Sequence, residues 1–378
     1  MNTPFEKAIS RLEIRRFPED KTLMAWNSAD SYLYNQLRED YSLTELTNQK
    51  ILLIGEEFSI PAILLQAYQP SLVSDSIFSK ISTQKNLVNN QLSSESVQHL
   101  SMVEFLEQPQ NLARFDIVLC KIPKSFDFFK QILSSFYNFT KPSTAFYFSG
   151  MVKYLSSNTR STLEAFFQEV HIQKTVKKAL LFKAKNTQIN VKPTNTVQSF
   201  QLENLGEFKA YTNTFCQGSL DKGTRLLLEN TKTNSLKGVG VDLGCGYGVI
   251  SRFVLDNQPE VTQLQCIDIS ELSIASTKLN TQSSNVEVQY LQQDGLASTK
   301  LASLDFVISN PPIHSQNSLS VNQSLRLFRQ VQKALKIGGK LYLVANKGLN
   351  YQPFLEKLFD NAKLVTQNKS YSIFECTK

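Results

Sequence analysis

The 378-residue sequence predicts an α/β protein of two tandem domains, each a mainly parallel sheet that ends in an antiparallel hairpin. Three observations support this fold class. The chain is too long for one ordinary core, and both halves alternate short apolar strands with amphipathic helical stretches. The halves also repeat the same landmarks in the same order. We expect domains at residues 1–186 and 199–378, joined by a linker at 187–198 that is rich in Asn, Thr, Pro and Val.

The internal repeat sets the domain plan. Gly55 precedes Pro123 by 68 residues, and Gly244 precedes Pro312 by the same 68 residues. Residues 115–123 resemble residues 304–312 at one offset of 189, which is half the chain. The closing segments 178–183 and 370–375 also correspond. An ordered set of matches indicates a duplication.

The elements of the second half follow in order from its apolar pattern. Each predicted strand is a short apolar run, and each predicted helix is amphipathic and lies between two strands. We expect strands at 240–243, 264–269, 286–291, 305–309 and 340–345, helices at 249–257, 270–281 and 323–335, and a closing hairpin at 363–376. The first half is expected to follow the same plan.

Composition excludes several classes of protein. The hydrophobic fraction of 41% suits packed domains, and no run approaches 18 apolar residues. The N-terminal stretch lacks an apolar signal core, so we expect a soluble, cytoplasmic, monomeric protein without membrane contact. The five cysteines and three histidines are scattered, and their spacing predicts neither disulfides nor a metal site.

Charge is uneven along the chain, although the net value is only +7. Residues 171–202 contain no acidic side chain but several basic ones: Lys174, Lys177, Lys178, Lys183, Lys185 and Lys192. Such a basic band favours a polyanionic partner such as nucleic acid. The alternative is a solvated hairpin face followed by a linker.

A glycine-rich turn after the strand at 240–243 predicts a cofactor site. Gly244, Gly246 and Gly248 let the backbone pass close to a ligand, and the next helix presents unpaired N–H groups. Asp242, two residues earlier, suits a cationic ligand that carries an amino acid better than a phosphate. S-adenosylmethionine is such a ligand. The alternative is a generic tight turn.

Three residues further along extend the predicted cofactor site. Asp268 ends the next strand 20 residues after Gly248, where a ribose diol would be held, and Ile269 could pack on an adenine face. Asp294 could accept the adenine amino group. The alternatives are a helix cap for Asp268 and a surface turn for Asp294.

The loop Asn310-Pro311-Pro312-Ile313-His314 predicts the chemistry. An exocyclic amine on a purine is a poor nucleophile, because its lone pair is delocalised into the ring. The Asn310 side-chain carbonyl can accept one N–H, and the prolines hold a main-chain carbonyl to accept the other. Two acceptors free the lone pair for attack on a sulfonium methyl group. The alternative is a rigid turn, and no catalytic role is assigned to His314.

The first half has lost both parts of this site. Glu56 and Glu57 stand where the second half has Cys245 and Gly246, and Lys121-Ile122-Pro123 stands against Asn310-Pro311-Pro312. We interpret the first half as a binding or positioning domain.

The marks of a known family run along nearly the full chain. They are Arg16-Phe17-Pro18, Ala25-Trp26, residues 29–33, residues 121–124, Phe215, residues 218–223, residues 241–248, residues 310–314 and Val344-Ala345-Asn346. With them the sequence resembles the bacterial ribosomal RNA guanine-N2 methyltransferases that have two tandem Rossmann-like methyltransferase domains, and most of all those of the large-subunit (23S) RNA. The resemblance implies S-adenosylmethionine as cofactor, a catalytic second domain, a degenerate first domain that helps to bind RNA, and Asp221 beside the cofactor.

One position departs from that family pattern. Ile313 stands where members carry an aromatic residue suited to stacking on a flipped-out base. Tyr247, Phe215 or Tyr351 could supply the aromatic face instead. Methylation of 16S RNA, of adenine N6 or of a glutamine amide stays open within the same chemistry. A non-catalytic RNA-binding assembly factor is the alternative from another class.

Overall fold

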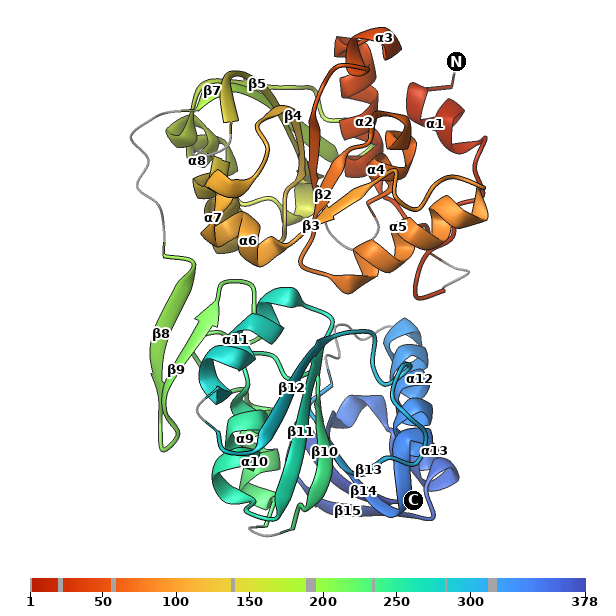
Figure 1. Ribbon diagram of the computed structural model, residues 1–378, viewed down its shortest axis with the longest axis vertical. Helices are drawn as coiled ribbons and strands as arrows, with labels where there is room; N and C mark the ends of the chain where they lie inside the picture. Colours follow the sequence, from red (N-terminus) through yellow and green to blue (C-terminus); the bar gives the residue numbers. More distant parts are fainter. Residues whose placement is uncertain are drawn as a thin grey trace. The chain divides into compact units, whose positions relative to one another are not determined.

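The protein consists of two compact units, Met1–Thr196 and Val197–Lys378 (Figure 1). The computed structural model describes residues 2–19, 23–55, 59–136, 140–187, 195–232, 235–282, 284–311 and 318–378. The boundary between the units falls inside the predicted linker. Its last two residues begin a strand of the second unit, because Val197 opens a two-stranded hairpin.

The first unit contains a seven-stranded sheet of order β3-β2-β1-β4-β5-β7-β6. Its strands are β1 (Ile51–Ile54), β2 (Ser71–Val73), β3 (Gln98–Leu100), β4 (Phe115–Lys121), β5 (Thr140–Met151), β6 (Phe167–Ile172) and β7 (Ala179–Thr187). Its helices are α1 (Pro4–Ile9), α2 (Ser28–Asp40), α3 (Leu43–Leu46), α4 (Ile60–Leu64), α5 (Ile77–Asn89), α6 (Met102–Glu107), α7 (Phe126–Ser135) and α8 (Thr159–Phe166). Strand β7 runs antiparallel to both of its neighbours.

The second unit repeats this order as β12-β11-β10-β13-β14-β16-β15. Its strands are β10 (Gly238–Leu243), β11 (Val261–Asp268), β12 (Glu287–Gln292), β13 (Leu304–Ser309), β14 (Leu335–Asn346), β15 (Asn361–Gln367) and β16 (Tyr371–Thr377). Its helices are α9 (Lys222–Asn230), α10 (Val249–Asn257), α11 (Glu271–Thr281), α12 (Ser318–Ala334) and α13 (Gln352–Leu358). A separate hairpin pairs β8 (Val197–Leu202) with β9 (Gly206–Tyr211).

The predicted fold class is confirmed. In each sheet the first five strands of the order are parallel, and the last two form an antiparallel hairpin. All the strands and helices predicted for the second half are present. Strand β14 begins at Leu335, earlier than predicted, because Leu335 pairs with Leu304 before the register shifts. The β8–β9 hairpin and the helices α9 and α13 were not predicted.

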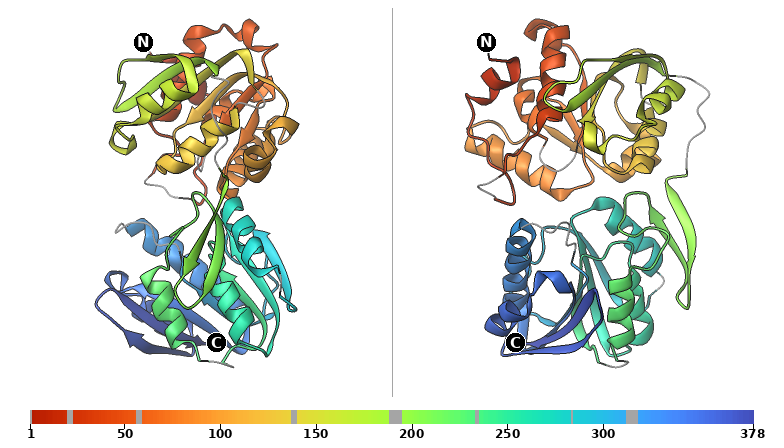
Figure 2. Two further views of the ribbon diagram at one scale, coloured as in Figure 1. Left: turned by 90° about the vertical axis from the view of Figure 1, so that its left-hand side faces the viewer. Right: turned by 180° about the vertical axis from the view of Figure 1, so that it is seen from behind.

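Helices cover both faces of each sheet (Figure 1, Figure 2). In the second unit α9, α10 and α11 lie on one face, and α12 and α13 lie on the other. Separate apolar cores therefore fill the two faces. Strand β10 pairs with both β11 and β13, and the chain order reverses between β10 and β13. Ligands of open α/β sheets bind outside the carboxyl ends of strands at such a switch point.

The described residues give no sign of a membrane or metal site. None of their helices combines the length and the apolar character needed to cross a bilayer. Their His, Cys, Asp and Glu side chains form no group of three that could hold a metal ion.

Candidate active site

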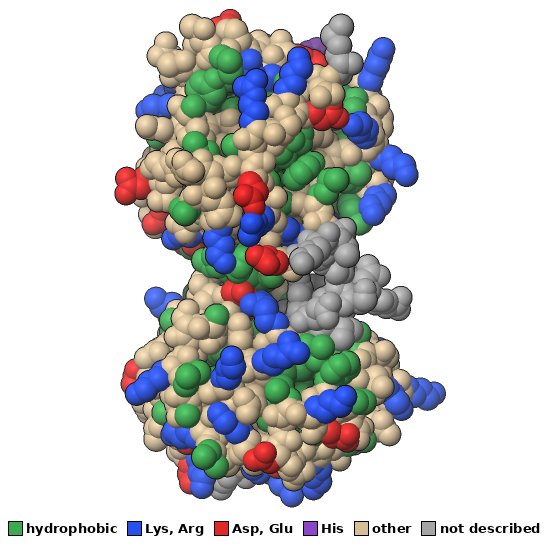
Figure 3. Space-filling view, turned by 90° about the vertical axis from the view of Figure 1, so that its right-hand side faces the viewer, with side chains coloured by type: hydrophobic (Ala, Val, Ile, Leu, Met, Phe, Trp, Pro, Cys, Tyr) green, Lys and Arg blue, Asp and Glu red, His purple; other side chains and the backbone are tan. Residues whose placement is uncertain are grey.

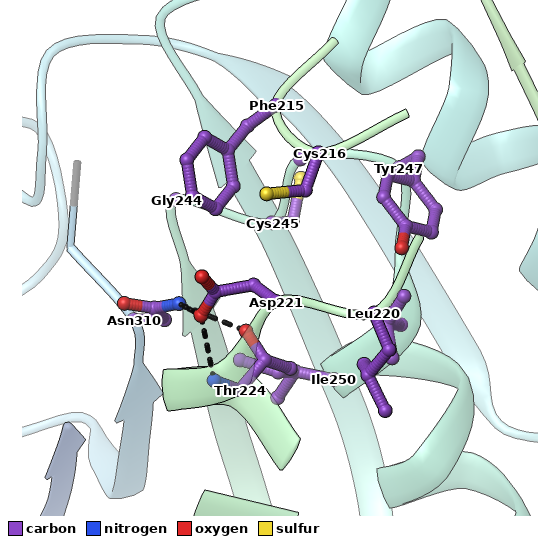
Figure 4. A pocket seen from close by; sticks show the side chains of 12 residues that line it. Phe215, Cys216, Leu220, Asp221, Thr224, Gly244, Cys245, Tyr247, Ile250 and Asn310 are labelled. Atoms are coloured by element: carbon purple, nitrogen blue, oxygen red, sulfur yellow. Dashed lines mark hydrogen bonds between the residues drawn. The ribbon is translucent and has the colours of Figure 1, made fainter. Parts of the chain in front are cut away.

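A hollow of about 370 Å³, partly open to solvent, lies at the carboxyl ends of β10 and β13 (Figure 4). Its walls come from the glycine turn, the start of α9 and the segment before α9: Phe215, Cys216, Leu220, Asp221, Thr224, Gly244, Cys245, Gly246, Tyr247, Val249, Ile250 and Asn310. Four predicted site residues, Asp221, Gly244, Gly246 and Asn310, therefore meet in one place.

The glycine turn has the backbone that its sequence requires. Gly244, Gly246 and Gly248 all have positive φ, with values of 80°, 58° and 88°. A Cβ on Gly248 would lie 3.0 Å from the Cα of Thr277, so α10 can start beside α11 only with glycine there. A Cβ on Gly246 would meet nothing within 4 Å, so this wall of the hollow is open to a ligand.

Asp242 lies in the core and is not among the residues that line the hollow. One carboxylate oxygen accepts a hydrogen bond of 2.6 Å from the Ser251 hydroxyl. The other is buried and has no hydrogen-bond partner among the described residues. Burial raises the pKa of Asp242 to about 7. The contact of Asp242 with a cationic ligand stays a prediction.

Asp268 holds the glycine turn in place. Its two carboxylate oxygens accept the N–H groups of Gly246 (3.0 Å) and Ser270 (2.9 Å), and burial raises its pKa. Ser270 is the N-cap of α11, so Asp268 does support the start of that helix. A carboxylate has about four acceptor sites, which leaves room for ribose hydroxyls. The ribose role stays a prediction.

The residues predicted for the adenine end lie outside the lining of the hollow. Ile269 is half-buried, and its main-chain carbonyl accepts a hydrogen bond from Gln292. Asp294 forms a two-pronged ion pair with Arg326, at 2.7 and 2.6 Å. Both oxygens of Asp294 are thus engaged, and its adenine role stays a prediction. Sequence reasoning missed Arg326, which lies 32 residues away on α12.

Asn310 follows β13, and its side chain is held by the start of α9. Its Nδ2 donates to Oδ2 of Asp221 (2.9 Å) and to Oγ1 of Thr224 (2.8 Å). Figure 4 shows the carbonyl oxygen of the amide pointing away from both partners. Asp221 is also the N-cap of α9, because the same Oδ2 accepts the N–H of Thr224. The resemblance to the family places the stretch from Leu220 to Thr224 over the cofactor, and the structure adds the contact of Thr224 with Asn310 on the first turn of α9.

The loop after Asn310 is described only in part. Pro311 is buried, and Ser309 before it donates a hydrogen bond of 2.6 Å to the carbonyl of Leu243. This bond ties the ends of β10 and β13 together. Three residues of the predicted loop, Pro312, Ile313 and His314, lie outside the described residues, as do Glu56 and Glu57 of the first unit.

One of the three candidate aromatic residues has an exposed ring. Tyr247 is buried, packs edge-on against Phe200 and Phe208, and donates its hydroxyl to Ser219. Tyr351 is buried and hydrogen bonded to Ser324. Phe215 lines the hollow and is 49% exposed.

The cysteines at the hollow are not suited to act as nucleophiles. Burial raises the pKa of the Cys245 thiol well above its usual value, and burial also raises that of Cys216. A thiol must ionise to attack carbon, so both stay in their unreactive form near neutral pH.

Comparisons with known proteins agree with this geometry. A family model described as the methyltransferase small domain matches residues 206–375, and one described as the RLMG N-terminal domain matches residues 2–188. The chain is 31% identical, over 388 aligned residues and the full length of both proteins, to ribosomal RNA large subunit methyltransferase G of Psychromonas ingrahamii. A 16S rRNA N2 methyltransferase (RsmC) of T. thermophilus, solved with AdoMet and guanosine, superposes with a TM-score of 0.73 at 17% identity. That match covers 93% of this chain and 92% of the other, and it shows a shared fold.

Proposed function

Because the chain belongs to the ribosomal RNA large subunit methyltransferase G family, we propose that it methylates the exocyclic N2 amino group of a guanine in 23S rRNA. The chain is an S-adenosylmethionine-dependent rRNA methyltransferase. The observation that carries the choice of an amino group is the Asn310 amide. Its N–H₂ end is occupied, and its carbonyl end is turned away from those partners.

The residues at the hollow fit the cofactor. Gly246 leaves the wall open to close approach, and the unpaired oxygen of Asp242 would favour a cation. Asp221 lines the same hollow. When bound, S-adenosylmethionine supplies an electrophilic methyl group on a sulfonium. We propose that Gly244, Gly246, Gly248, Asp242 and Asp221 hold its methionine end and that Asp268, Ile269 and Asp294 hold its adenosine end.

The chain's own residues prepare the amine. Asn310 Oδ1 accepts one N–H of the guanine amino group, and the Asn310–Pro311 main chain, which lacks the proline N–H, supplies the second acceptor. Two accepted hydrogen bonds draw the amine toward tetrahedral geometry. The lone pair is then localised on nitrogen and can attack the methyl carbon in line. Pro312 and Ile313 complete the loop in this proposal.

Phe215 is the aromatic residue that we propose to stack on the target base. Its ring is 49% exposed at the hollow that Asn310 also lines. Stacking of a base on an aromatic side chain contributes on the order of 1–3 kcal/mol. This contribution would compensate for Ile313, which has no aromatic face.

We propose that the first unit contacts RNA on the side of its sheet where the carboxyl ends of the parallel strands lie. The predicted basic band is partly neutralised, since Lys177 pairs with Glu6 and Lys183 pairs with Asp40. A second group of cations, most of them outside that band, lies around Tyr154, which is 49% exposed. Lys124 and Lys153 place their ammonium groups 5.1 and 4.4 Å from the Tyr154 ring, and the Lys178 carbonyl accepts the N–H of Val152. We call Lys124, Lys153, Tyr154 and Lys178 the Tyr154 cluster. An aromatic ring among cations is a typical contact for single-stranded RNA.

The second unit also presents basic surface. Figure 3 shows Lys and Arg side chains spread over the face that carries α12 and α13, with acidic side chains among them. The Lys and Arg side chains of this face would attract phosphates. We further propose that the enzyme works as a cytoplasmic monomer without a metal ion, which size-exclusion chromatography with light scattering and metal analysis would test.

The function is tested by methylation of defined RNA. Purified protein and S-adenosylmethionine are incubated with 23S or 16S rRNA from a strain that lacks this protein, both as naked RNA and as ribosomal particles. Mass mapping should find one new N2-methylguanine in 23S rRNA, and its yield at a fixed early time should fall about 10²- to 10³-fold in reactions with Asn310→Ala. Methyl groups found only in 16S rRNA, on adenine N6 or on a glutamine amide would contradict the proposal. Failure to bind S-adenosylmethionine by isothermal titration would leave an RNA-binding assembly factor.

A further inference from the structure

We infer that Asp221, together with Thr224, is a positioning residue that fixes the side-chain amide of Asn310 with its carbonyl toward the amine to be methylated. This inference rests on the proposed function. It gives Asp221 a role beyond the cofactor contact that the sequence predicts. The inference follows from which atoms donate and which accept at the start of α9.

The donor and acceptor pattern allows one orientation of the amide. Each hydrogen of Asn310 Nδ2 has its own acceptor, the Asp221 carboxylate at 2.9 Å and the Thr224 hydroxyl at 2.8 Å. An ionised carboxylate accepts only. If the amide were flipped, its carbonyl oxygen would face the carboxylate oxygen, and the N–H₂ group would face the amine. Both contacts would be repulsive, and the second would remove the acceptor on which the proposed chemistry depends.

The first unit repeats the contact with a different partner. Asp30, at the start of α2, accepts a hydrogen bond of 2.8 Å from Lys121, and Lys121 occupies the position that matches Asn310. In both units a carboxylate at the start of a helix that precedes the seven-stranded sheet holds a donor at the end of the fourth strand of that sheet. The ammonium of Lys121 has only donors, so it offers no acceptor for the N–H groups of an amine. The amide of Asn310 donates to the carboxylate and still has its carbonyl.

The two oxygens of Asp221 serve different tasks. Oδ2 accepts both the Asn310 amide and the Thr224 N–H. Figure 4 shows the other oxygen turned away from Asn310, toward the side of the hollow where Phe215 lies. The predicted cofactor contact of Asp221 belongs to this second oxygen. Positioning therefore needs an oxygen at the Oδ2 site, whereas cofactor binding needs the negative charge.

This division makes the two roles separable by substitution. Asp221→Asn keeps a carbonyl that can replace Oδ2, and Asn caps a helix as well as Asp. Asp221→Ala removes the acceptor. At saturating S-adenosylmethionine, we expect kcat to fall roughly 10- to 100-fold in Asp221→Ala, the range produced by a small misplacement of a reacting group. Asp221→Asn should recover most of that loss while its cofactor Kd rises. Thr224→Val should give a smaller loss that Thr224→Ser recovers.

Two readouts separate positioning from general damage. In an Asn310→Ala background, Asp221→Ala should cause no further loss of kcat, because the group that it orients is gone. In protein labelled with ¹⁵N at asparagine, the Asn310 side-chain resonance, assigned by its absence in Asn310→Ala, should move in Asp221→Ala and stay near its position in Asp221→Asn. Thermal melting checks that each variant is folded.

Several results would overturn the inference. Asp221→Ala could match the wild-type kcat and change only cofactor Kd, which would make Asp221 a cofactor ligand alone. Asp221→Asn could be as slow as Asp221→Ala with unchanged Kd, or the loss could persist in the Asn310→Ala background. A wild-type protein that methylates no RNA would sink the proposed function instead, and the amide resonance would still report the orientation of Asn310.

Discussion

Where the second unit buries Asp242, the first unit buries Leu53 at the matched position of the matched strand. The surrounding strands keep the same order in both units. Leu53 belongs to the apolar core of its unit, whereas Asp242 has an oxygen without a partner among the described residues. The difference shows that the second unit tolerates a costly buried carboxylate that its scaffold does not require. We infer that such a group belongs to the unit that binds the ligand.

The start of the following helix differs in the same way. Gly248 and Ser59 occupy matched positions, and both are left-handed N-cap residues, with φ of 88° and 44°. The first unit therefore keeps the turn but not the glycine. Ser59 also hydrogen bonds with Ser79 at 2.8 Å, which supports the turn locally. We infer that the first unit has kept the backbone conformation of this turn, although no ligand has to approach the backbone closely there.

The largest difference between the units should appear in the methyl-transfer rate when Asn310 or Lys121 is replaced by alanine in separate variants. Asn310→Ala should reduce single-turnover methyl transfer by about 10²- to 10³-fold, as for loss of one polarising contact, while cofactor Kd stays within a few-fold. Lys121→Ala should leave the transfer rate unchanged. It should lower the free energy of unfolding by about 1–3 kcal/mol, because Asp30 is left without its ion partner. Retained turnover in Asn310→Ala would contradict the proposed role of its carbonyl.

The next largest effect, on stability and on cofactor binding, should come from giving Leu53 of β1 and Asp242 of β10 each other's residue type in separate variants. Leu53→Asp should destabilise the protein by about 3–5 kcal/mol, the cost of a buried charge without a partner. Asp242→Leu should stabilise it by about 1–4 kcal/mol and abolish cofactor binding. Urea unfolding and isothermal titration measure the two properties. Equal and opposite stability changes without loss of binding would show that Asp242 has no part in the site.

The same carboxylate predicts a pH dependence. The pKa of Asp242 is raised to about 7 in the folded protein, against about 3.9 in an unfolded chain. The folded state therefore holds the proton more tightly, and this contribution to stability, full below pH ~3.9, is lost as pH rises through about 7. The stability gain of Asp242→Leu over wild type should grow from pH 5 to pH 7 and then level off. A gain independent of pH would contradict the raised pKa.

A smaller effect should follow from exchanging Gly248 and Ser59. Gly248→Ser should cost about 1–3 kcal/mol, because its Cβ meets the Thr277 backbone and its φ is positive. Ser59→Gly should change little. Relief of the left-handed serine, about 1 kcal/mol, is offset by loss of the hydrogen bond to Ser79, also about 1 kcal/mol. Thermal unfolding of both variants measures the comparison, and a large loss in Ser59→Gly would contradict it.

The smallest effect concerns RNA binding by the first unit. Replacing Lys124, Lys153 and Lys178 by alanine should reduce the slope of log Kd against log salt by about 2, at roughly 0.7 per phosphate contact on single strands. The matched control replaces Lys177 and Lys183, which are already paired with acidic groups. Filter binding of an rRNA fragment at several salt concentrations gives the slopes. Equal changes in both sets would remove the Tyr154 cluster from the RNA contact.

The sequence by itself determined the duplication, the succession of strands and helices along the second half, and the glycine turn. These features depend on local periodicity, on residue spacing and on the backbone freedom of glycine, all of which are written along the chain. It also predicted a role for Asn310 from its short motif, whereas Asp221 was predicted only from the resemblance to the family. It did not predict the β8–β9 hairpin, whose pattern is short and polar.

Only the tertiary structure decided how those residues work together. The orientation of the Asn310 amide depends on Asp221 and Thr224, which lie 89 and 86 residues away in sequence. The pairing of Asp294 with Arg326 and the burial of Tyr247 likewise depend on contacts between distant elements. Donor and acceptor matching acts through space at distances of about 3 Å, so no spacing along the chain encodes it. The fold brings the start of α9 to the end of β13, and that contact fixes which atom of Asn310 faces the hollow.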